Sequence, residues 1–349
     1  MIPEKMKAIV VTAPKKVEVK EVSTPVPVEG EVLVRIDNCM ICTWEQRLFT
    51  GTSGQLPYIP GHEFSGIVAA VPETTMTNVV PGQKCVVKIY DSCGCCEYCF
   101  RGLDNLCSGK SKERIFDGIP GTGGLARYIA ISADRVYALP NEETDLELAT
   151  FTEPLACCIH SIEQADVGFG EDVVVVGAGV MGQLHAILAR LRGSRVIVVE
   201  MDKARRELAL QMGAHEAVDP SITYWKSELL RLTGGRGPHV VQYTINNLDL
   251  AGEYVDVVAP AGRLVFYGSF HPSGDVPFSP NNVHYTEKVI TGSYSPTVKS
   301  FWQASHMLSH KLIDVKPYLT ETYSMDEAQI AFERAMSPDT FRVLIRLSD

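Results

Sequence analysis

The sequence predicts an α/β protein of two domains, one with a doubly wound parallel sheet and one with a small barrel of mostly antiparallel strands. Three observations support this prediction. At 349 residues the chain is longer than one hydrophobic core usually supports. Residues 6–132 hold short runs of alternating apolar and polar residues, separated by turns rich in Gly and Pro. From Asp172 onward, apolar strand-like runs alternate with amphipathic helical runs, the pattern of βαβ units.

The strands expected in the barrel domain lie in six segments: KAIVV, VEVKEV, EVLVRI, FSGIVAAV, KCVVKIY and ARYIAI. Near Asp145 the pattern changes, and LELATFTEPLACCIHSIEQA reads as a helical bridge to the second domain. The doubly wound domain is expected over residues 156–292. The segments after Gly292 are too short for a third domain, so we expect them to pack on the first.

The glycine-rich segment DVVVVGAGVMG, residues 172–182, is the centre of the second domain. Four consecutive valines are typical of a parallel strand buried on both faces. Gly177, Gly179 and Gly182 form G-x-G-x-x-G, with Val180 and Met181 between them, where the strand turns into a helix. These glycines permit a tight turn, close approach of a pyrophosphate and close helix–strand packing. The pattern alone is a weak signal, but this strand–turn–helix context indicates a dinucleotide-binding site.

An acidic residue ends the next predicted strand. Glu200 follows Gly182 by eighteen residues, where a carboxylate accepts hydrogen bonds from a ribose 2′-OH and repels a 2′-phosphate. This position favours NAD over NADP, and a simple surface carboxylate is the alternative interpretation.

The composition limits the classes of partner that the protein is expected to bind. The net charge of −10 argues against a nucleic-acid surface. We find no signal peptide and no apolar run long enough for a membrane span, so we expect a cytoplasmic protein. Ten cysteines in such a chain point to metal binding or catalysis rather than to disulfides.

Four cysteines have a metal-binding spacing. Cys93, Cys96, Cys99 and Cys107 follow C-x₂-C-x₂-C-x₇-C in a glycine-bearing loop. Four thiolates can enclose tetrahedral zinc with no open position, so we expect a structural zinc site. Disulfides and an iron–sulfur cluster are the alternatives. Cys95 lies within the loop but outside the spacing.

Four other possible metal ligands are scattered along the chain: Cys42, His62, Glu63 and Glu153. Taken singly, Cys42 could be a small buried core residue and His62 a turn histidine. Spacing alone does not join them.

The order of these motifs resembles the zinc-dependent medium-chain dehydrogenases, most closely the branch of polyol (sorbitol-like) and threonine dehydrogenases. The resemblance rests on Cys42, GHE at 61–63, the four spaced cysteines, EP at 153–154 and GAGVMG at 177–182. It covers essentially the whole chain. It implies a GroES-like catalytic domain of residues 1–155 and 293–349, and a homotetramer or homodimer.

The resemblance also implies a site and its cofactors. Cys42 and His62 would hold a catalytic zinc between the domains, with Glu63 and Glu153 as the carboxylates of the site. With the structural zinc this makes two zinc ions per subunit. Arg205 matches a position on the adenosine side of the cofactor, although it and Arg206 keep NADP possible. Gly268 and Tyr294 belong to later loops that resemble those touching the nicotinamide half.

The sequence departs from the family after Cys42. Trp44 replaces the hydroxyl that usually relays the substrate proton, and Arg47 replaces the relay histidine. Glu45 keeps an acid at the usual Asp position, and Thr43 is a hydroxyl that could take over the relay. Two interpretations of this departure are open. One is a local rearrangement without effect on function, and the other is a reshaped pocket in which Trp44 is a platform for a sugar-like ring and Arg47 is a charge near the mouth. Phe116 and Tyr294 are further candidates for the substrate pocket.

We therefore expect a zinc-dependent oxidoreductase that transfers hydride between a secondary alcohol and NAD. The substrate would be a polyol, a sugar, a cyclitol or aminocyclitol, or an amino alcohol. The alternatives are a threonine-type dehydrogenase and a nucleotide-binding zinc protein without turnover that acts as a sensor or scaffold.

Overall fold

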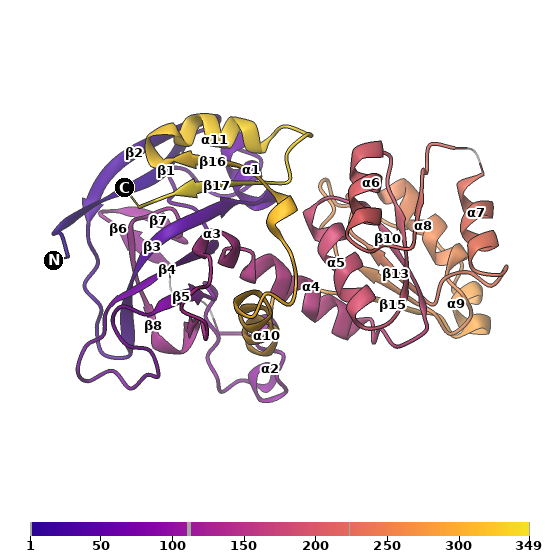
Figure 1. Cartoon of the computed structure of the whole chain (residues 1–349), viewed down its shortest axis with the longest axis horizontal. Coiled ribbons are helices and arrows are strands. Elements are labelled where there is room, and N and C mark those ends of the chain that lie inside the picture. Colours follow the sequence, from indigo (N-terminus) through magenta and orange to yellow (C-terminus); the bar gives the residue numbers. More distant parts are fainter. Residues whose placement is uncertain (1, 110–112, 223, 349) are drawn as a thin grey trace. The chain divides into compact units, whose positions relative to one another are not determined.

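The computed structural model describes residues 2–109, 113–222 and 224–348, and the chain divides into two compact units. The first unit comprises Met1–Ala156 with Thr297–Asp349, and the second comprises Cys157–Pro296 (Figure 1). The boundaries expected from the sequence, at residues 155 and 292, lie one and four residues earlier.

The first unit is built on a seven-stranded sheet. Its strands, in spatial order, are β16 (Leu319–Ser324), β17 (Arg342–Arg346), β3 (Glu31–Ile41), β4 (Glu63–Ala70), β5 (Lys84–Val87) and β9 (Val136–Ala138), with β8 (Tyr128–Ser132) paired to β3. Neighbouring strands are antiparallel except β16 and β17, which run parallel. The C-terminal strand β17 thus completes a sheet begun near the N-terminus.

Two small hairpins flank this sheet, β1 (Lys5–Ala13) with β2 (Lys16–Ser23), and β6 (Arg114–Phe116) with β7 (Ile119–Gly121). The helical segments are α1 (Thr43–Thr50), α2 (Glu97–Phe100), η1 (Asp104–Leu106), η2 (Ala133–Arg135), α3 (Leu146–Ala149), α10 (Val298–Ser309), η3 (Lys316–Tyr318), η4 (Met325–Glu327) and α11 (Ala328–Ala335). The alternating apolar residues of the strands form the core: Val34, Ile36, Ile129 and Ile345 are fully buried in one cluster.

The second unit contains a six-stranded parallel sheet. Its order is β12 (Glu216–Val218), β11 (Arg195–Val199), β10 (Asp172–Val176), β13 (Val240–Tyr243), β14 (Arg263–Phe266) and β15 (Val289–Gly292). Its helices are α5 (Val180–Leu191), α6 (Lys203–Gln211), α7 (Trp225–Leu232), α8 (Leu248–Val257) and α9 (Pro280–Thr286). In chain order this is 3-2-1-4-5-6, a doubly wound sheet. The predicted α/β fold class is confirmed.

The predicted bridging helix is two helices, α3 and α4 (Thr152–Gln164). Pro154 explains the break, because its ring nitrogen cannot donate to a carbonyl of a preceding turn. Proline is tolerated in the first turn of a new helix, which is where Pro154 lies in α4.

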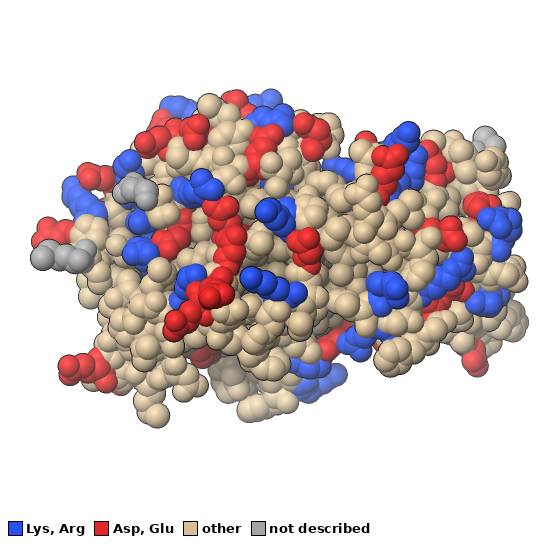
Figure 2. Space-filling model, in the orientation of Figure 1, with Lys and Arg blue, Asp and Glu red and all other residues tan. Residues whose placement is uncertain are grey.

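Charged side chains of both signs are interspersed on the face seen in Figure 2. None of the helices in the described part of the chain has the length and apolar character needed to cross a membrane.

Candidate active site and metal centres

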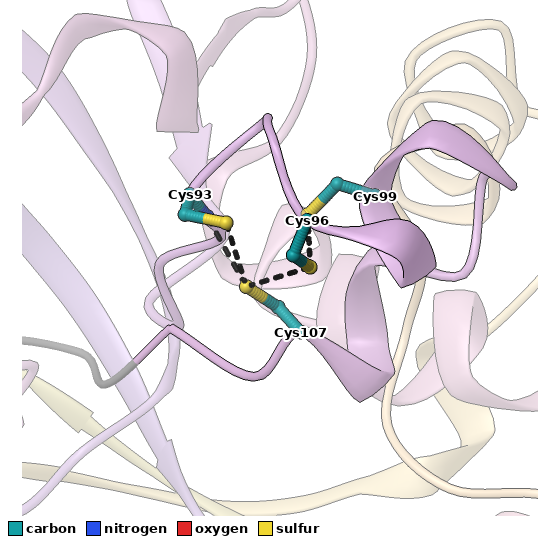
Figure 3. Close-up of side chains that lie close together, drawn as sticks. All are labelled: Cys93, Cys96, Cys99 and Cys107. Carbon is teal, nitrogen blue, oxygen red and sulfur yellow. Dashed lines mark hydrogen bonds between the residues drawn. The ribbon is translucent and has the colours of Figure 1, made fainter.

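The four spaced cysteines gather around one point in the loop that holds α2 (Figure 3). Sulfur–sulfur distances are 3.6 Å from Cys96 to Cys99, 3.8 Å from Cys96 to Cys107 and 3.5 Å from Cys107 to Cys93. Zinc–sulfur bonds of about 2.3 Å in a tetrahedron require sulfur–sulfur edges of about 3.8 Å. The thiols are free, and their spacing is too wide for S–S bonds of about 2.05 Å. These residues fit a tetrahedral ion such as zinc.

Local backbone shapes this cysteine lobe, residues 93–109. Hydrogen bonds from the backbone N–H groups of Cys99 and Ser108 lower the pKa of Cys96 to about 5 and favour the thiolate that metals bind. Gly109 donates its N–H to Cys107 Sγ at 3.3 Å. A Cβ there would approach the Cys93 Cβ to 3.0 Å, so glycine permits the close turn. Cys95 is exposed and lies outside the group.

A second group joins two strands of the first unit. β3 ends at Ile41, Cys42 caps the N-terminus of α1, and β4 begins at Glu63. Because Met40 pairs with Glu63, the register brings Cys42 beside His62. Cys42 Sγ lies 3.2 Å from His62 Nε2, and one ligand atom from each of Cys42, His62 and Glu63 lies within 4.8 Å of the others.

Glu45 orients this pair. Its carboxylate is fully buried, and Oε1 lies 2.8 Å from His62 Nδ1 and accepts from the Gly61 N–H at 3.1 Å. Oε2 accepts from the Cys42 N–H at 3.2 Å. A proton on Nδ1 would leave Nε2, the atom facing Cys42, free to bind a metal.

The protonation of the pair suits a cation site. Burial raises the pKa of Cys42 to about 11. For His62 burial lowers the pKa, but the negative charges of Glu45 and Cys42 outweigh it and raise the pKa well above its ordinary value. Each shift favours the protonated form of its group, and a metal cation that binds here would displace a proton. A thiolate, an imidazole and a carboxylate are zinc ligands, and these residues fit zinc.

Arg342 on β17 holds Glu63. Its Nε and Nη2 donate to the two Glu63 oxygens at 2.9 and 2.8 Å, and both side chains are buried. Burial lowers the pKa of Arg342, but the charges of Glu63, Cys42 and Glu153 together raise it. Sequence reasoning missed Arg342. The only signal was a charged residue at the start of an apolar strand.

The remaining predicted metal ligand, Glu153, lies in the first turn of α4. Its carboxylate is outside the group formed by Cys42, His62 and Glu63, although its charge acts on Arg342. Thr43 is exposed at the start of α1.

The predicted pocket residues have different surroundings. Trp44 is half-buried, with its ring 5.6 Å from Tyr58 and 6.3 Å from His62 in edge-on arrangements. Arg47 is half-buried on the same helix. Phe116 packs in a core cluster with Ile59 and Tyr128, and its place in the pocket stays a prediction. Tyr294, in the second unit, is 69% exposed.

The glycine turn of the second unit has the geometry that its motif requires. Gly177 has a φ of 92°, and a Cβ there would lie 2.4 Å from an Ile245 methyl carbon. At Gly182 a Cβ would lie 1.9 Å from the Gly177 carbonyl oxygen. Gly179 is the N-cap of α5, whose free N–H groups start at this turn. Gly268 follows β14 and donates to the Tyr243 carbonyl at 3.2 Å.

Glu200 is placed against this turn. Its Oε2 accepts from the Ala178 N–H at 2.7 Å and its Oε1 from the Asp202 N–H at 2.9 Å. Arg206 Nη2 forms an ion pair with Asp219 Oδ2 at 3.0 Å, and Arg206 Nη1 donates to the Glu200 carbonyl oxygen at 2.6 Å. Arg205 lies close to Gly179, whose added Cβ would be 3.8 Å from its Nη1.

Comparison with known proteins decides the family. Residues 28–141 match the model of the alcohol dehydrogenase GroES-like domain, and residues 180–310 match that of the zinc-binding dehydrogenases. The chain belongs to the zinc-binding dehydrogenases. The predicted polyol and threonine dehydrogenase branch is confirmed, and the protein is an oxidoreductase that acts on CH–OH groups.

Three relatives illustrate this family. L-galactonate-5-dehydrogenase of Escherichia coli K12 is 27% identical, over 94% of this chain and 95% of that protein. Sorbitol dehydrogenase of Halalkalibacterium halodurans is 28% identical, over 94% of each chain. A crystal structure of a zinc-binding dehydrogenase from Sinorhizobium meliloti 1021, bound to NADP, has a TM-score of 0.89 and 26% identity, over 99% of this chain and 100% of that one.

Proposed function

We propose that the protein is an NAD-linked, zinc-dependent dehydrogenase of polyhydroxylated secondary alcohols. The observation that carries the proposal is the buried pair of Cys42 and His62, which Glu45 holds with a histidine nitrogen facing the thiol. In a structural zinc site four protein ligands fill the coordination sphere, whereas a catalytic zinc site keeps one coordination position for the substrate. The relatives are named for a sugar acid and a polyol, both polyhydroxylated.

Zinc at this position would act as a Lewis acid that lowers the pKa of an alcohol, as it does that of water. The chain's own residues supply the rest. Glu45 fixes the ring of His62, and the backbone N–H of Trp44 donates to Cys42 Sγ at 3.3 Å, which stabilises the thiolate. The indole of Trp44 cannot accept a proton, so we assign proton transfer to solvent to the exposed hydroxyl of Thr43.

Between the two carboxylates, we assign the metal ligand role to Glu153. Both oxygens of Glu63 already accept hydrogen bonds from Arg342, and an ion pair buried in this way resists separation. Glu63 would then stay with Arg342 and contribute charge near the ion, although Glu63, and not Glu153, belongs to the group with Cys42 and His62. The closed cysteine lobe would hold the second zinc.

NAD is the proposed cofactor. The Glu200 carboxylate lies against the glycine turn, where it would accept from a ribose 2′-OH and repel a 2′-phosphate. Arg206, the cation that could offset this repulsion, is already engaged by Asp219.

The test measures the absorbance of reduced nicotinamide. Zinc-loaded protein is mixed with NAD or NADP and with each member of a panel of polyols, sugar acids, amino alcohols and cyclitols. We expect turnover with NAD and a polyhydroxylated substrate, and loss of turnover with unchanged NAD binding in Cys42→Ser and Glu153→Ala. Turnover of threonine alone would favour the threonine-type enzyme. Tight NAD binding and full zinc occupancy without any turnover would favour the sensor or scaffold.

Stepwise removal of metal gives a second test. A site with a carboxylate ligand should release zinc to a chelator before the four-thiolate lobe does. We therefore expect activity to fall while circular dichroism still reports the native fold. Simultaneous loss of activity and structure would contradict the proposed pair of sites.

A further inference from the structure

Three side chains with aromatic rings, Trp302, His306 and His310, follow one another at intervals of four residues along α10 in the first unit (Figure 1). Residues four apart on a helix lie on the same face. The ring centroids of Trp302 and His306 are 4.3 Å apart, and those of His306 and His310 are 5.8 Å apart. The backbone N–H of His310 donates to the His306 carbonyl at 3.0 Å, so the two histidines belong to one helical turn.

This spacing of two histidines suits a metal ion, because side chains four apart on a helix can bind one ion together. Imidazole nitrogens bind zinc at about 2.0–2.1 Å, so two rings on one tetrahedral ion have centroids about 5 Å apart. The observed separation of 5.8 Å is slightly larger. A small rotation of the exposed His310 side chain would close the difference.

The pair is accessible from solvent, and one of its rings is held in place. His310 is exposed, and His306 is half-buried with its ring against the indole of Trp302. This contact restricts the motion of the His306 ring, so less conformational entropy is lost when an ion binds. Trp302 is itself 52% exposed, which leaves the same face of the helix open.

The ligand types limit the ion. Within residues 2–109, 113–222 and 224–348, no third His, Cys, Asp or Glu forms a metal-binding group with this pair. Water would therefore complete the coordination of an ion held here, and the ion would exchange with solvent. Imidazole ligands suit nickel, copper and zinc, whereas magnesium and calcium prefer oxygen ligands.

We propose that His306 and His310 form a further metal site, apart from both metal centres described above, that binds a divalent transition-metal ion at the C-terminal end of α10. This inference does not depend on the proposed dehydrogenase function. The ion would join two residues of the last turn of α10. Because it binds only the folded turn, it would also raise the melting temperature.

The experiment adds Ni²⁺ to zinc-loaded protein and measures binding by calorimetry. We expect one nickel ion per chain at this site. His306→Asn and His310→Asn should each weaken nickel binding by about 10-fold or more, since loss of an outer-shell partner alone costs that much. Nickel should raise the melting temperature of the wild type and not of these two variants. His284→Asn, which changes an exposed histidine of the second unit, is the matched control and should bind nickel as the wild type does.

Tryptophan fluorescence locates the bound nickel. Trp302 lies beside the proposed site, whereas Trp44 lies 6.3 Å from His62 of the catalytic group. Trp302→Phe should therefore lose most of the quenching by nickel while calorimetry still shows binding. Quenching that persists in Trp302→Phe would overturn the proposal, and so would wild-type nickel affinity in His306→Asn. Release of zinc in proportion to the nickel bound would place the nickel in one of the zinc centres and would also overturn it.

Discussion

Arg342 donates two hydrogen bonds to the buried carboxylate of Glu63, at 2.9 and 2.8 Å, across 279 positions of sequence. This ion pair ties the C-terminal strand β17 to β4, on either side of β3. It also fixes one of the two carboxylates near the proposed catalytic zinc. Both consequences can be tested.

Replacing Arg342 by Met should be strongly destabilising, because Glu63 would be left buried and unpaired. We expect a loss of about 3–5 kcal/mol in the free energy of unfolding, measured by denaturant titration. The double variant Arg342→Met with Glu63→Gln should recover part of that loss. Arg346→Gln, which breaks the more exposed pair with Glu147, is the control and should cost about 1 kcal/mol or less. Equal effects of Arg342→Met and the control would show that the buried pair does not hold the strand.

The cysteine lobe should depend on all four of its thiols. Cys96→Ser removes one of them and should release the metal of the lobe, lower the melting temperature and leave Cys42 and His62 in place. Cys95→Ser is the matched control, because Cys95 is exposed and outside the group. Elemental analysis should find zinc and no iron in the wild type. Full metal content in Cys96→Ser would contradict the assignment.

The preference for NAD should depend on the charge of Glu200. Glu200→Gln keeps an oxygen that can accept from the Ala178 N–H but removes the charge that repels a 2′-phosphate. The ratio of kcat/KM for NAD to that for NADP should therefore fall by about 10-fold. Glu207→Gln on the exposed side of α6 should leave the ratio unchanged. A wild-type enzyme that uses both cofactors equally would refute this prediction.

The free energy of unfolding at acid pH should depend on the buried histidine of α5. His185 is fully buried, its Nδ1 lies 2.7 Å from the Met181 carbonyl oxygen, and burial lowers its pKa to about 4. Since the unfolded side chain titrates near 6.5, the unfolded state binds more protons between these values. The stabilisation is complete above about pH 6.5 and decreases toward pH 4, by about 3 kcal/mol in all.

His185→Asn should flatten this part of the stability curve measured by denaturant titration from pH 4 to 7. His284→Asn changes an exposed histidine and should leave the slope as it is in the wild type. An unchanged slope in His185→Asn would show that other groups govern acid unfolding.

Local patterns predicted most of the architecture. The valines of β10 and the glycines after them specify a strand, a turn and a helix within eleven residues, so no distant contact is needed to recognise them. The cysteine lobe could be predicted for the same reason, since its ligands lie within fifteen residues and can wrap one ion. Helix breaks were harder, and the separation of α3 from α4 was not expected.

Local patterns predict the two domains, the glycine turn and the cysteine lobe, because each of these features arises from neighbours along the chain. Cys42 and His62 were joined only by family resemblance, and in the structure the pairing of β3 with β4 brings them together. The pairing of Arg342 with Glu63 is visible only in the folded chain. The same holds for the buried Nε of Arg47, which has no hydrogen-bond partner in the part of the chain that the structure describes. These contacts depend on strand register and on the neighbours of a buried group. Both are set by residues that lie far apart in the sequence.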